Sequence, residues 1–131
     1  MESIYNIWLI DDDPIQNKLN VRTISGALPK ACNFQCYTDP KSALGTLKEN
    51  AERPDFTFID LDMPSMKGID FIKAAHEMGL RTPVIILSSS INGETLEFAK
   101  SCNIVQDCIH KPLVRSDLCL LYTSPSPRDR G

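Results

Sequence analysis

Short apolar runs alternate with segments of helical periodicity along this chain, and this alternation restricts its possible folds more than any other feature. The runs predict strands at residues 4–10, 34–37, 55–59, 84–87 and 105–110. Helices are predicted after Asp13, from Pro40, over 69–78 and over 92–100, and Ser116 is the expected cap of a fifth helix. Strands that alternate with helices predict a parallel sheet that is covered on both faces and joined by right-handed crossovers.

The first helical segment carries the usual signals of a helix start. Asp13 is expected to be the N-cap, with Pro14 at the first helical position and Gln16 completing a capping box. The apolar residues of this helix are Ile15, Leu19, Val21, Ile24 and Leu28. They indicate a first helix that ends near Pro29.

Residues 119–131 differ in composition from the rest of the chain. The segment reads CLLYTSPSPRDRG and interrupts the opening turns of the expected fifth helix. Its first part resembles the translation of a sequencing-library adapter, and a native linker towards an output domain is the alternative. We therefore expect one domain at residues 1–118, truncated in its fifth helix, and a non-native tail at residues 119–131.

Charge and cysteine content exclude several classes of protein. A net charge of −3 and a pI near 5.3 disfavour direct nucleic-acid binding, which requires clustered Lys and Arg. No run approaches the roughly 18 apolar residues of a membrane span, and no signal peptide is evident. A cytoplasmic protein without membrane contact is expected, with its five cysteines as reduced thiols because their number is odd.

Polar residues that can take part in chemistry follow the expected strands. In an open parallel sheet, reactive groups gather beyond the carboxyl ends of the strands, near the point where the strand order reverses. The residues at these ends are Asp11 and Asp12 after the first strand, Asp60 at the third, Ser88 at the fourth and Lys111 after the fifth. One site built from these residues is therefore predicted.

Asp11, Asp12 and Asp60 would bring three carboxylates together in this site. They would repel one another unless a hard divalent cation neutralised them. Mg²⁺ takes oxygen ligands, keeps several waters and shares its shell readily with a phosphoryl oxygen, so a magnesium site is predicted. A helix start would explain only one acidic residue, and that role is assigned to Asp13.

Lys111 and Ser88 each have a structural and a functional interpretation. Lys111 could be an ordinary solvated lysine, but its position just past a buried strand allows its ammonium group to point across the strand ends at a phosphoryl group or at Asp60. A cis peptide bond between Lys111 and Pro112 would help to aim it. Residues 88–90 could be only a polar loop, or the Ser88 hydroxyl could donate to a phosphoryl oxygen.

Four segments at the ends of four strands, IWLIDDDP, FTFIDLDMPSMKG, VIILSSS and CIHKPL, resemble in order and spacing the receiver domain of bacterial two-component response regulators. The resemblance covers residues 3–118. It implies a CheY-like α/β fold of the flavodoxin type, doubly wound, with a five-stranded parallel sheet in the order 2-1-3-4-5. It also implies a phosphorelay signalling domain that phosphorylates and slowly dephosphorylates itself, rather than a turnover enzyme.

The same resemblance implies roles for the residues at the strand ends. Asp60 would attack the phosphorus of a phosphohistidine on a sensor histidine kinase or a histidine phosphotransfer protein. Asp12 would bind Mg²⁺ directly and Asp11 largely through water, with Asp60 and the backbone carbonyl of Asp62 as further ligands. Ser88 and Lys111 would hold the phosphoryl oxygens.

The resemblance further implies how the phosphorylated state is timed and reported. The side chains of Asp62 and Ser90 would flank the path of a hydrolytic water and set the lifetime of that state. Cys108 stands where the family often has an aromatic residue that turns inward, so this part of the switch is altered. The fourth helix, fifth strand and fifth helix would form the face that binds a downstream protein target.

Two other functions fit parts of the pattern. A phosphohydrolase of the haloacid dehalogenase type would use FIDLD as its nucleophile strand, but that family places its acidic metal pair after the lysine, and nothing remains here for a substrate-selecting cap. A phosphorylation-inert binding domain of the same fold is the other alternative. Against it, Asp11, Asp12, Asp60, Ser88 and Lys111 are all present.

Overall fold

The computed structural model describes residues 5–28, 31–49 and 53–118, which form alternating strands and helices. The elements are β1 (Tyr5–Ile10), α1 (Pro14–Ala27), β2 (Cys32–Tyr37), α2 (Pro40–Glu49), β3 (Phe56–Asp60), α3 (Gly68–Glu77), β4 (Val84–Ser88), α4 (Gly93–Ser101) and β5 (Val105–His110). A helical turn at residues 115–118 follows β5. The predicted tail at residues 119–131 and Cys119 lie outside the described residues.

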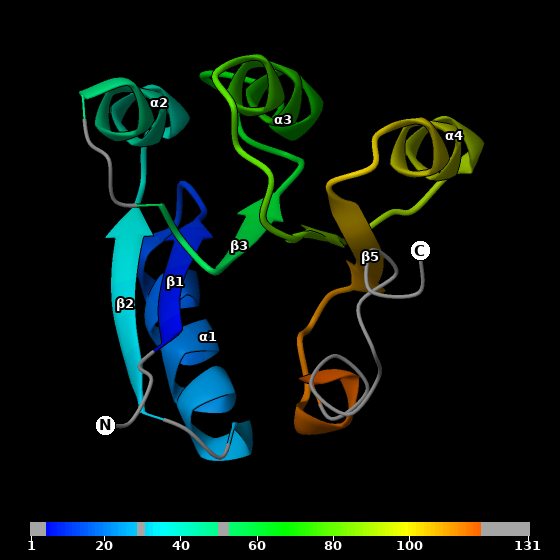
Figure 1. The fold of residues 1–131 in the computed structure, drawn as a ribbon. Coiled ribbons are helices and arrows are strands. Elements are labelled where there is room, and N and C mark those ends of the chain that lie inside the picture. Colours follow the sequence, from blue (N-terminus) through cyan, green and yellow to red (C-terminus); the bar gives the residue numbers. More distant parts are fainter. Residues whose placement is uncertain (1–4, 29–30, 50–52, 119–131) are drawn as a thin grey trace.

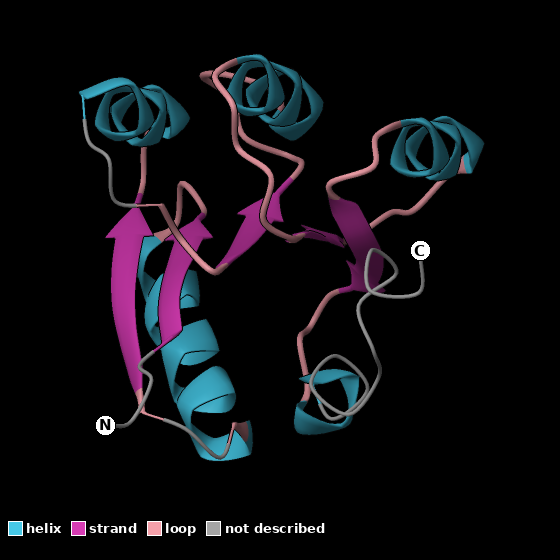
Figure 2. Ribbon diagram, viewed as in Figure 1, coloured by secondary structure: helices cyan, strands magenta, loops and turns pink. Residues whose placement is uncertain are grey.

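The strands form one parallel sheet in the order β2-β1-β3-β4-β5, which confirms the expected fold class (Figure 1). Helices α2, α3 and α4 cover one face, and α1 and the turn at 115–118 cover the other (Figure 2). The chain passes from β1 outward to β2 and then back across β1 to β3. The strand order therefore reverses at the carboxyl ends of β1 and β3, where ligand sites of such sheets form.

Two hydrophobic clusters occupy the two faces of the sheet. Alternate residues of β1 divide between them, because successive side chains of a strand point to opposite faces. Ile7 and Leu9 pack with Ile24 of α1, whereas Trp8 and Ile10 belong to the cluster under α2 and α3. The central strands are buried on both sides, as is typical of a parallel sheet between helical layers.

The inner face of helix α1 is partly polar. Ile15 and Leu19 are 67% and 51% exposed, whereas Asn17 and Asn20 are buried and Ile24 lies in the core. Ile15 and Leu19, two of the apolar residues of this helix, therefore lie outside the core. The Asn17 amide donates to the backbone carbonyls of Asp11 and Tyr37, and the Asn20 side chain accepts from the Gln16 amide.

The caps of the helices agree only partly with the predicted signals. The Asp13 carboxylate accepts a hydrogen bond from the Ile15 N–H, so its role as N-cap is confirmed. The capping box with Gln16 was wrong, because the Asp13 N–H donates to Asp11 Oδ1 and the Gln16 amide donates to Asn20.

Val114, and not the predicted Ser116, stands at the cap position directly before the turn at 115–118. Ser116 lies inside the helical turn, so its assignment as cap was wrong. Instead, the Asp117 carboxylate accepts a hydrogen bond from the Val114 N–H at 3.0 Å. This is the reciprocal half of a capping box, in which the third helical residue reaches back to the cap.

Three further features of the structure concern a predicted helix end, the cysteines and the possibility of a membrane span. Gly79, which directly follows the helix predicted over 69–78, has a φ of +100°, a conformation that favours glycine. The cysteines of the described segments, Cys32, Cys36, Cys102 and Cys108, are free thiols. In the same segments, no helix combines the length and the apolar character that a membrane span requires.

Candidate functional site at the carboxyl edge of the sheet

Backbone hydrogen bonds extend the sheet past its strand ends and fix the residues there. The Asp11 N–H donates to the Tyr37 carbonyl at 3.0 Å, and the Lys111 N–H donates to the Ser88 carbonyl at 2.9 Å. Asp60 is the last residue of β3 and is paired with Leu87 of β4. The expectation that these residues share one edge is thus met by the sheet itself, not only by side-chain contacts.

Three carboxylates meet at this edge. Carboxylate oxygens of Asp11, Asp12 and Asp60 all lie within 4.8 Å of one another. Asp11 and Asp60 are each only 3% exposed, and Asp12 is exposed. The acidic cluster expected at the ends of β1 and β3 is therefore present.

The Asp11 carboxylate is held on one oxygen and unsatisfied on the other. Its Oδ1 accepts from the Asp13 N–H at 2.9 Å, whereas its buried Oδ2 has no hydrogen-bond partner among the described residues. Burial raises the pKa of Asp11 to about 6, and the negative charge of Asp60 adds to this rise. The folded chain therefore pays in free energy to keep Asp11 ionised at neutral pH.

Lys111 is the cation of this edge. Its Nζ lies 3.0 Å from Asp60 Oδ1 and 3.7 Å from Asp11 Oδ2. Burial lowers the pKa of Lys111, but the hydrogen bond to Asp60 and the charges of Asp60, Asp11 and Asp62 together raise it above its ordinary value. The side chain points into the site as predicted, and the bond between Lys111 and Pro112 is cis.

The donor set of the cluster fits a hard divalent cation. Asp11, Asp12 and Asp60 supply three negative charges, and Lys111 is the one cation that ion-pairs with them among the described residues. The unsatisfied Oδ2 of Asp11 is an oxygen available to a further cation. Carboxylate oxygens with space for water are the ligands that Mg²⁺ prefers.

The loop between β4 and α4 borders the acidic cluster. Ser88 is 1% exposed, and its Oγ donates to the Ser90 carbonyl at 3.0 Å and lies 3.5 Å from Asp62 Oδ2. The Ser89 hydroxyl donates to the same Asp62 oxygen at 3.4 Å. Asp62 is tied back to the cluster, since its N–H donates to Asp60 Oδ1 at 3.1 Å.

Sequence reasoning placed Ser88, Ser90 and Asp62 in this region but overlooked Ser89. The structure brings Ser90 to Ser88 through its backbone, since its N–H donates to Ser88 Oγ at 3.2 Å and its carbonyl accepts from it. No hydrogen bond of the Ser90 side chain is found among the described residues. The run of three serines was a visible signal, but which hydroxyl meets Asp62 depends on the path of the loop.

Cys108 lies on β5 opposite Ile86 of β4, half-buried against the cluster under α2 and α3. Burial raises the pKa of its thiol, and the negative charge of Asp107 raises it further. The thiol therefore stays protonated at neutral pH. It occupies far less volume than an aromatic side chain would at this place.

Asn17 is a second residue that sequence reasoning missed. It is 2% exposed, and its Nδ2 donates to the backbone carbonyls of Asp11 at 3.2 Å and Tyr37 at 3.4 Å. It thereby ties α1 to the ends of β1 and β2. Its position within an apolar helical pattern was the only available signal.

Gly68 allows α3 to start directly against the chain that follows Asp60. A Cβ at this residue would lie 2.8 Å from the Leu61 Cα and 2.9 Å from the Asp60 carbonyl oxygen. Both atoms belong to the backbone, so they cannot move aside as a flexible side chain would. The glycine therefore sets how closely the first turn of α3 approaches the acidic cluster.

Gly68→Ala is expected to destabilise the fold by about 1–3 kcal/mol, because the added methyl group forces a backbone shift beside Asp60. Urea unfolding measures this change. The matched control is Gly45→Ala in the middle of α2, where an added Cβ meets nothing within 4 Å. That control is expected to be neutral or to stabilise by up to about 1 kcal/mol. Equal stabilities of the two variants would contradict the close approach.

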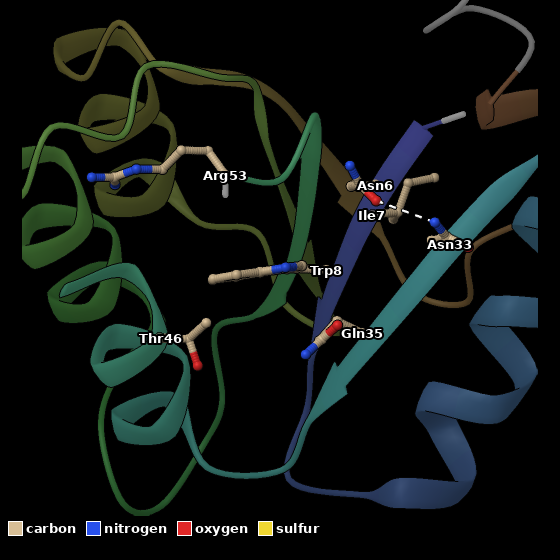
Figure 3. A pocket seen from close by; sticks show the side chains of 7 residues that line it. All are labelled: Asn6, Ile7, Trp8, Asn33, Gln35, Thr46 and Arg53. Carbon is tan, nitrogen blue, oxygen red and sulfur yellow. Dashed lines mark hydrogen bonds between the residues drawn. The ribbon is translucent and has the colours of Figure 1, made fainter. Parts of the chain in front are cut away.

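A small cavity lies away from this edge. It has a volume of about 70 Å³ and is lined by Asn6, Ile7, Trp8, Asn33, Gln35, Thr46 and Arg53 (Figure 3). The Asn33 amide donates to Asn6 Oδ1 at 3.5 Å, at the amino ends of β1 and β2. The cavity thus belongs to the opposite end of the strands from Asp60.

Comparison with known proteins gives consistent matches over nearly the whole chain. A family model described as the response regulator receiver domain matches residues 7–122. The protein-glutamate methylesterase/protein-glutamine glutaminase of Treponema denticola is 33% identical over 126 residues, covering 96% of this chain and 30% of that protein. The transcriptional regulatory protein DcuR of Escherichia coli is 30% identical over 115 residues, covering 85% and 46%. The chain spans less than half the length of these two relatives.

Solved structures agree with the described sheet. A two-component response regulator from Cytophaga hutchinsonii superposes with a TM-score of 0.81 at 29% identity, covering 93% of this chain and 96% of that one. A CheY-like receiver domain protein from Methanospirillum hungatei gives a TM-score of 0.77 at 17% identity, covering 92% of each chain, and shows the fold alone.

Proposed function

The chain belongs to the response regulator receiver domain family, and on this premise we propose that Asp60 accepts the phosphoryl group in a phosphorelay. The observation that carries this assignment is the Lys111 ammonium, 3.0 Å from a buried Asp60 carboxylate inside a cluster of three aspartates. A cation held at the acceptor neutralises charge where a phosphoryl group would arrive. The donor would be a phosphohistidine on a sensor histidine kinase or a histidine phosphotransfer protein.

In this reaction an Asp60 carboxylate oxygen attacks phosphorus, and the bond between phosphorus and the histidine nitrogen breaks. The electron pair stays on the imidazole, which takes up a proton. Lys111 and the Ser88 hydroxyl hold the phosphoryl oxygens. Asp62 and Ser90 flank the approach of the water that later hydrolyses the acyl phosphate.

The acidic cluster would hold Mg²⁺ through Asp12 directly, Asp11 largely through water, Asp60, and the backbone carbonyl of Asp62. The bound ion would supply positive charge to the carboxylates and to phosphoryl oxygens. The Asp11 Oδ2, which has no hydrogen-bond partner among the described residues, and the raised pKa of Asp11 support this assignment, since a bound cation would stabilise this buried charge.

We further propose that phosphorylation changes the surface beside α4 and β5. The phosphoryl group adds almost two negative charges and draws the Ser88 hydroxyl away from the Ser90 carbonyl. The loop leading to α4 repacks as a result. Leu96 on α4 and Val114 after β5 are 47% and 46% exposed, and they offer apolar contacts to a downstream protein. Because Cys108 stands in place of an aromatic residue, this response depends more on the loop between β4 and α4 than on the turning of an aromatic side chain in β5.

We also propose bounds and a cellular compartment for the domain. Residues 1–118 form the receiver domain, which signals rather than turning over a substrate and does not itself bind nucleic acid. The free thiols of Cys32, Cys36, Cys102 and Cys108 support a reducing compartment, the cytoplasm.

A stoichiometry experiment separates the receiver from a phosphohydrolase. Acetyl phosphate with Mg²⁺ is expected to add at most one phosphoryl group per chain, as an alkali-labile acyl phosphate seen by intact-protein mass spectrometry. p-Nitrophenyl phosphate is expected to give no sustained release of nitrophenol. Many turnovers of the ester would favour the haloacid dehalogenase type, and absence of any labelling would favour a phosphorylation-inert domain.

A further inference from the structure

Asp62 engages the same groups that the proposed function assigns to the phosphoryl group. Its Oδ2 lies 3.5 Å from Ser88 Oγ and 3.4 Å from Ser89 Oγ. Its negative charge also acts on the Lys111 ammonium. In the unphosphorylated chain, a carboxylate thus lies beside the Ser88 hydroxyl and acts electrostatically on the Lys111 ammonium.

We propose that Asp62 occupies the place of the phosphoryl oxygens before phosphorylation, and that Ser89 is the positioning residue that anchors it there. The inference rests on the proposed function, because Ser88 and Lys111 matter only if a phosphoryl group arrives at Asp60. Asp62 is then a competing anion within the chain. An incoming phosphoryl group displaces it.

The acceptors of the Ser88 and Ser89 hydroxyl groups show why Ser89 is the anchor. A serine hydroxyl carries one proton. The Ser88 proton is committed to the Ser90 carbonyl by the shorter contact of 3.0 Å, which leaves little for Asp62 at 3.5 Å. The Ser89 hydroxyl has Asp62 as its one acceptor among the described residues.

Asp62 needs such an anchor because it is exposed. An exposed carboxylate prefers full hydration and would otherwise turn into solvent. Its backbone is already fixed, since the Asp62 N–H donates to Asp60 Oδ1 at 3.1 Å. The Ser89 hydroxyl therefore decides only where the carboxylate points, towards Ser88 or towards water.

Removing the anchor is expected to favour the phosphoryl group. With Ser89→Ala, Asp62 turns to solvent and repels an anion at Asp60 less, so affinity for beryllofluoride rises about threefold, the worth of one ordinary hydrogen bond. Asp62→Asn removes the competing charge itself and is expected to raise the affinity about tenfold. Ser89→Ala should add nothing to Asp62→Asn, because Ser89 acts through the carboxylate.

The test is a beryllofluoride titration of the 131-residue chain in Mg²⁺, followed by ¹⁹F NMR. The variants are Ser89→Ala, Ser89→Thr, Asp62→Asn and the Ser89→Ala/Asp62→Asn pair. Ser89→Thr keeps the hydroxyl at an exposed position and should bind as the parent chain does. The control is Ser25→Ala, which removes an exposed hydroxyl from the far end of α1 and should leave the affinity unchanged.

The outcomes separate this inference from the proposed function. If the parent chain binds and Ser89→Ala binds equally or more weakly, the inference alone is overturned. It is also overturned if the effects of Ser89→Ala and Asp62→Asn are additive, since a merely structural role of Ser89 would produce that result. If the parent chain binds no beryllofluoride, both the inference and the proposed function fail.

Discussion

Asp60→Asn is expected to abolish Mg²⁺-dependent labelling of the chain by acetyl phosphate. The amide has the shape of the carboxylate but lacks the anionic oxygen that attacks phosphorus, so no acyl phosphate forms. Lys111 stays close to Asp11, which lies 3.7 Å from its ammonium group, so the fold is expected to survive. Intact-protein mass spectrometry measures the labelling, and circular dichroism checks that the variant is folded.

Asp13→Asn is the matched control for the loss of one negative charge beside the cluster. Asp13 caps α1 by accepting from the Ile15 N–H, a role that asparagine fills equally well. Its labelling should therefore equal that of the parent chain. If the Asp60→Asn protein were still labelled, Asp60 would be excluded as the acceptor. Unlabelled Asp13→Asn protein would mean that the loss follows from net charge alone.

Asp11→Asn is expected to stabilise the chain when Mg²⁺ is absent and to weaken the response to Mg²⁺. Burial raises the pKa of Asp11 from 3.8 to about 6, so the folded state binds the Asp11 proton more tightly than the unfolded state does. Ionised Asp11 thus opposes folding. The penalty is absent below the unfolded pKa, grows as the pH rises, and is complete above about pH 6. Its size at neutral pH is about 1–3 kcal/mol.

Urea unfolding at several pH values, with EDTA and with Mg²⁺, measures both effects. Asp11→Asn should exceed the parent in stability at about pH 7.5 in EDTA, and the difference should vanish near about pH 4. Mg²⁺ should stabilise the parent chain and stabilise the variant much less. Asp70→Asn, an exposed acid in the first turn of α3, should show neither change. If Asp11→Asn were less stable than its parent in EDTA, ionised Asp11 would not oppose folding.

Local signals in the sequence specify the order of the elements. Apolar runs identified all five strands, and β2 proved longer than expected because Cys32 and Asn33 also pair with β1. Asp11, Asp12, Asp60, Ser88 and Lys111 could be placed at one edge because parallel strands present their carboxyl ends together. Periodicity did not reveal the role of Asn17, because its amide bonds to the Asp11 carbonyl at the end of β1 and to the Tyr37 carbonyl at the end of β2, two groups that only the fold brings together.

The sequence by itself determined the fold class and the set of charged residues at the carboxyl edge of the sheet. Both follow from local signals, since strand period, helix caps and the residues just past each strand are written within a few positions of one another. Tertiary structure alone decided which groups meet. The contact of Ser89 with Asp62, the approach of Gly68 to Leu61 and the capping of Val114 by Asp117 depend on loop paths and packing distances. Such partners are selected by the folded backbone, because a hydrogen bond or a steric contact is set by a few tenths of an ångström that no sequence spacing specifies.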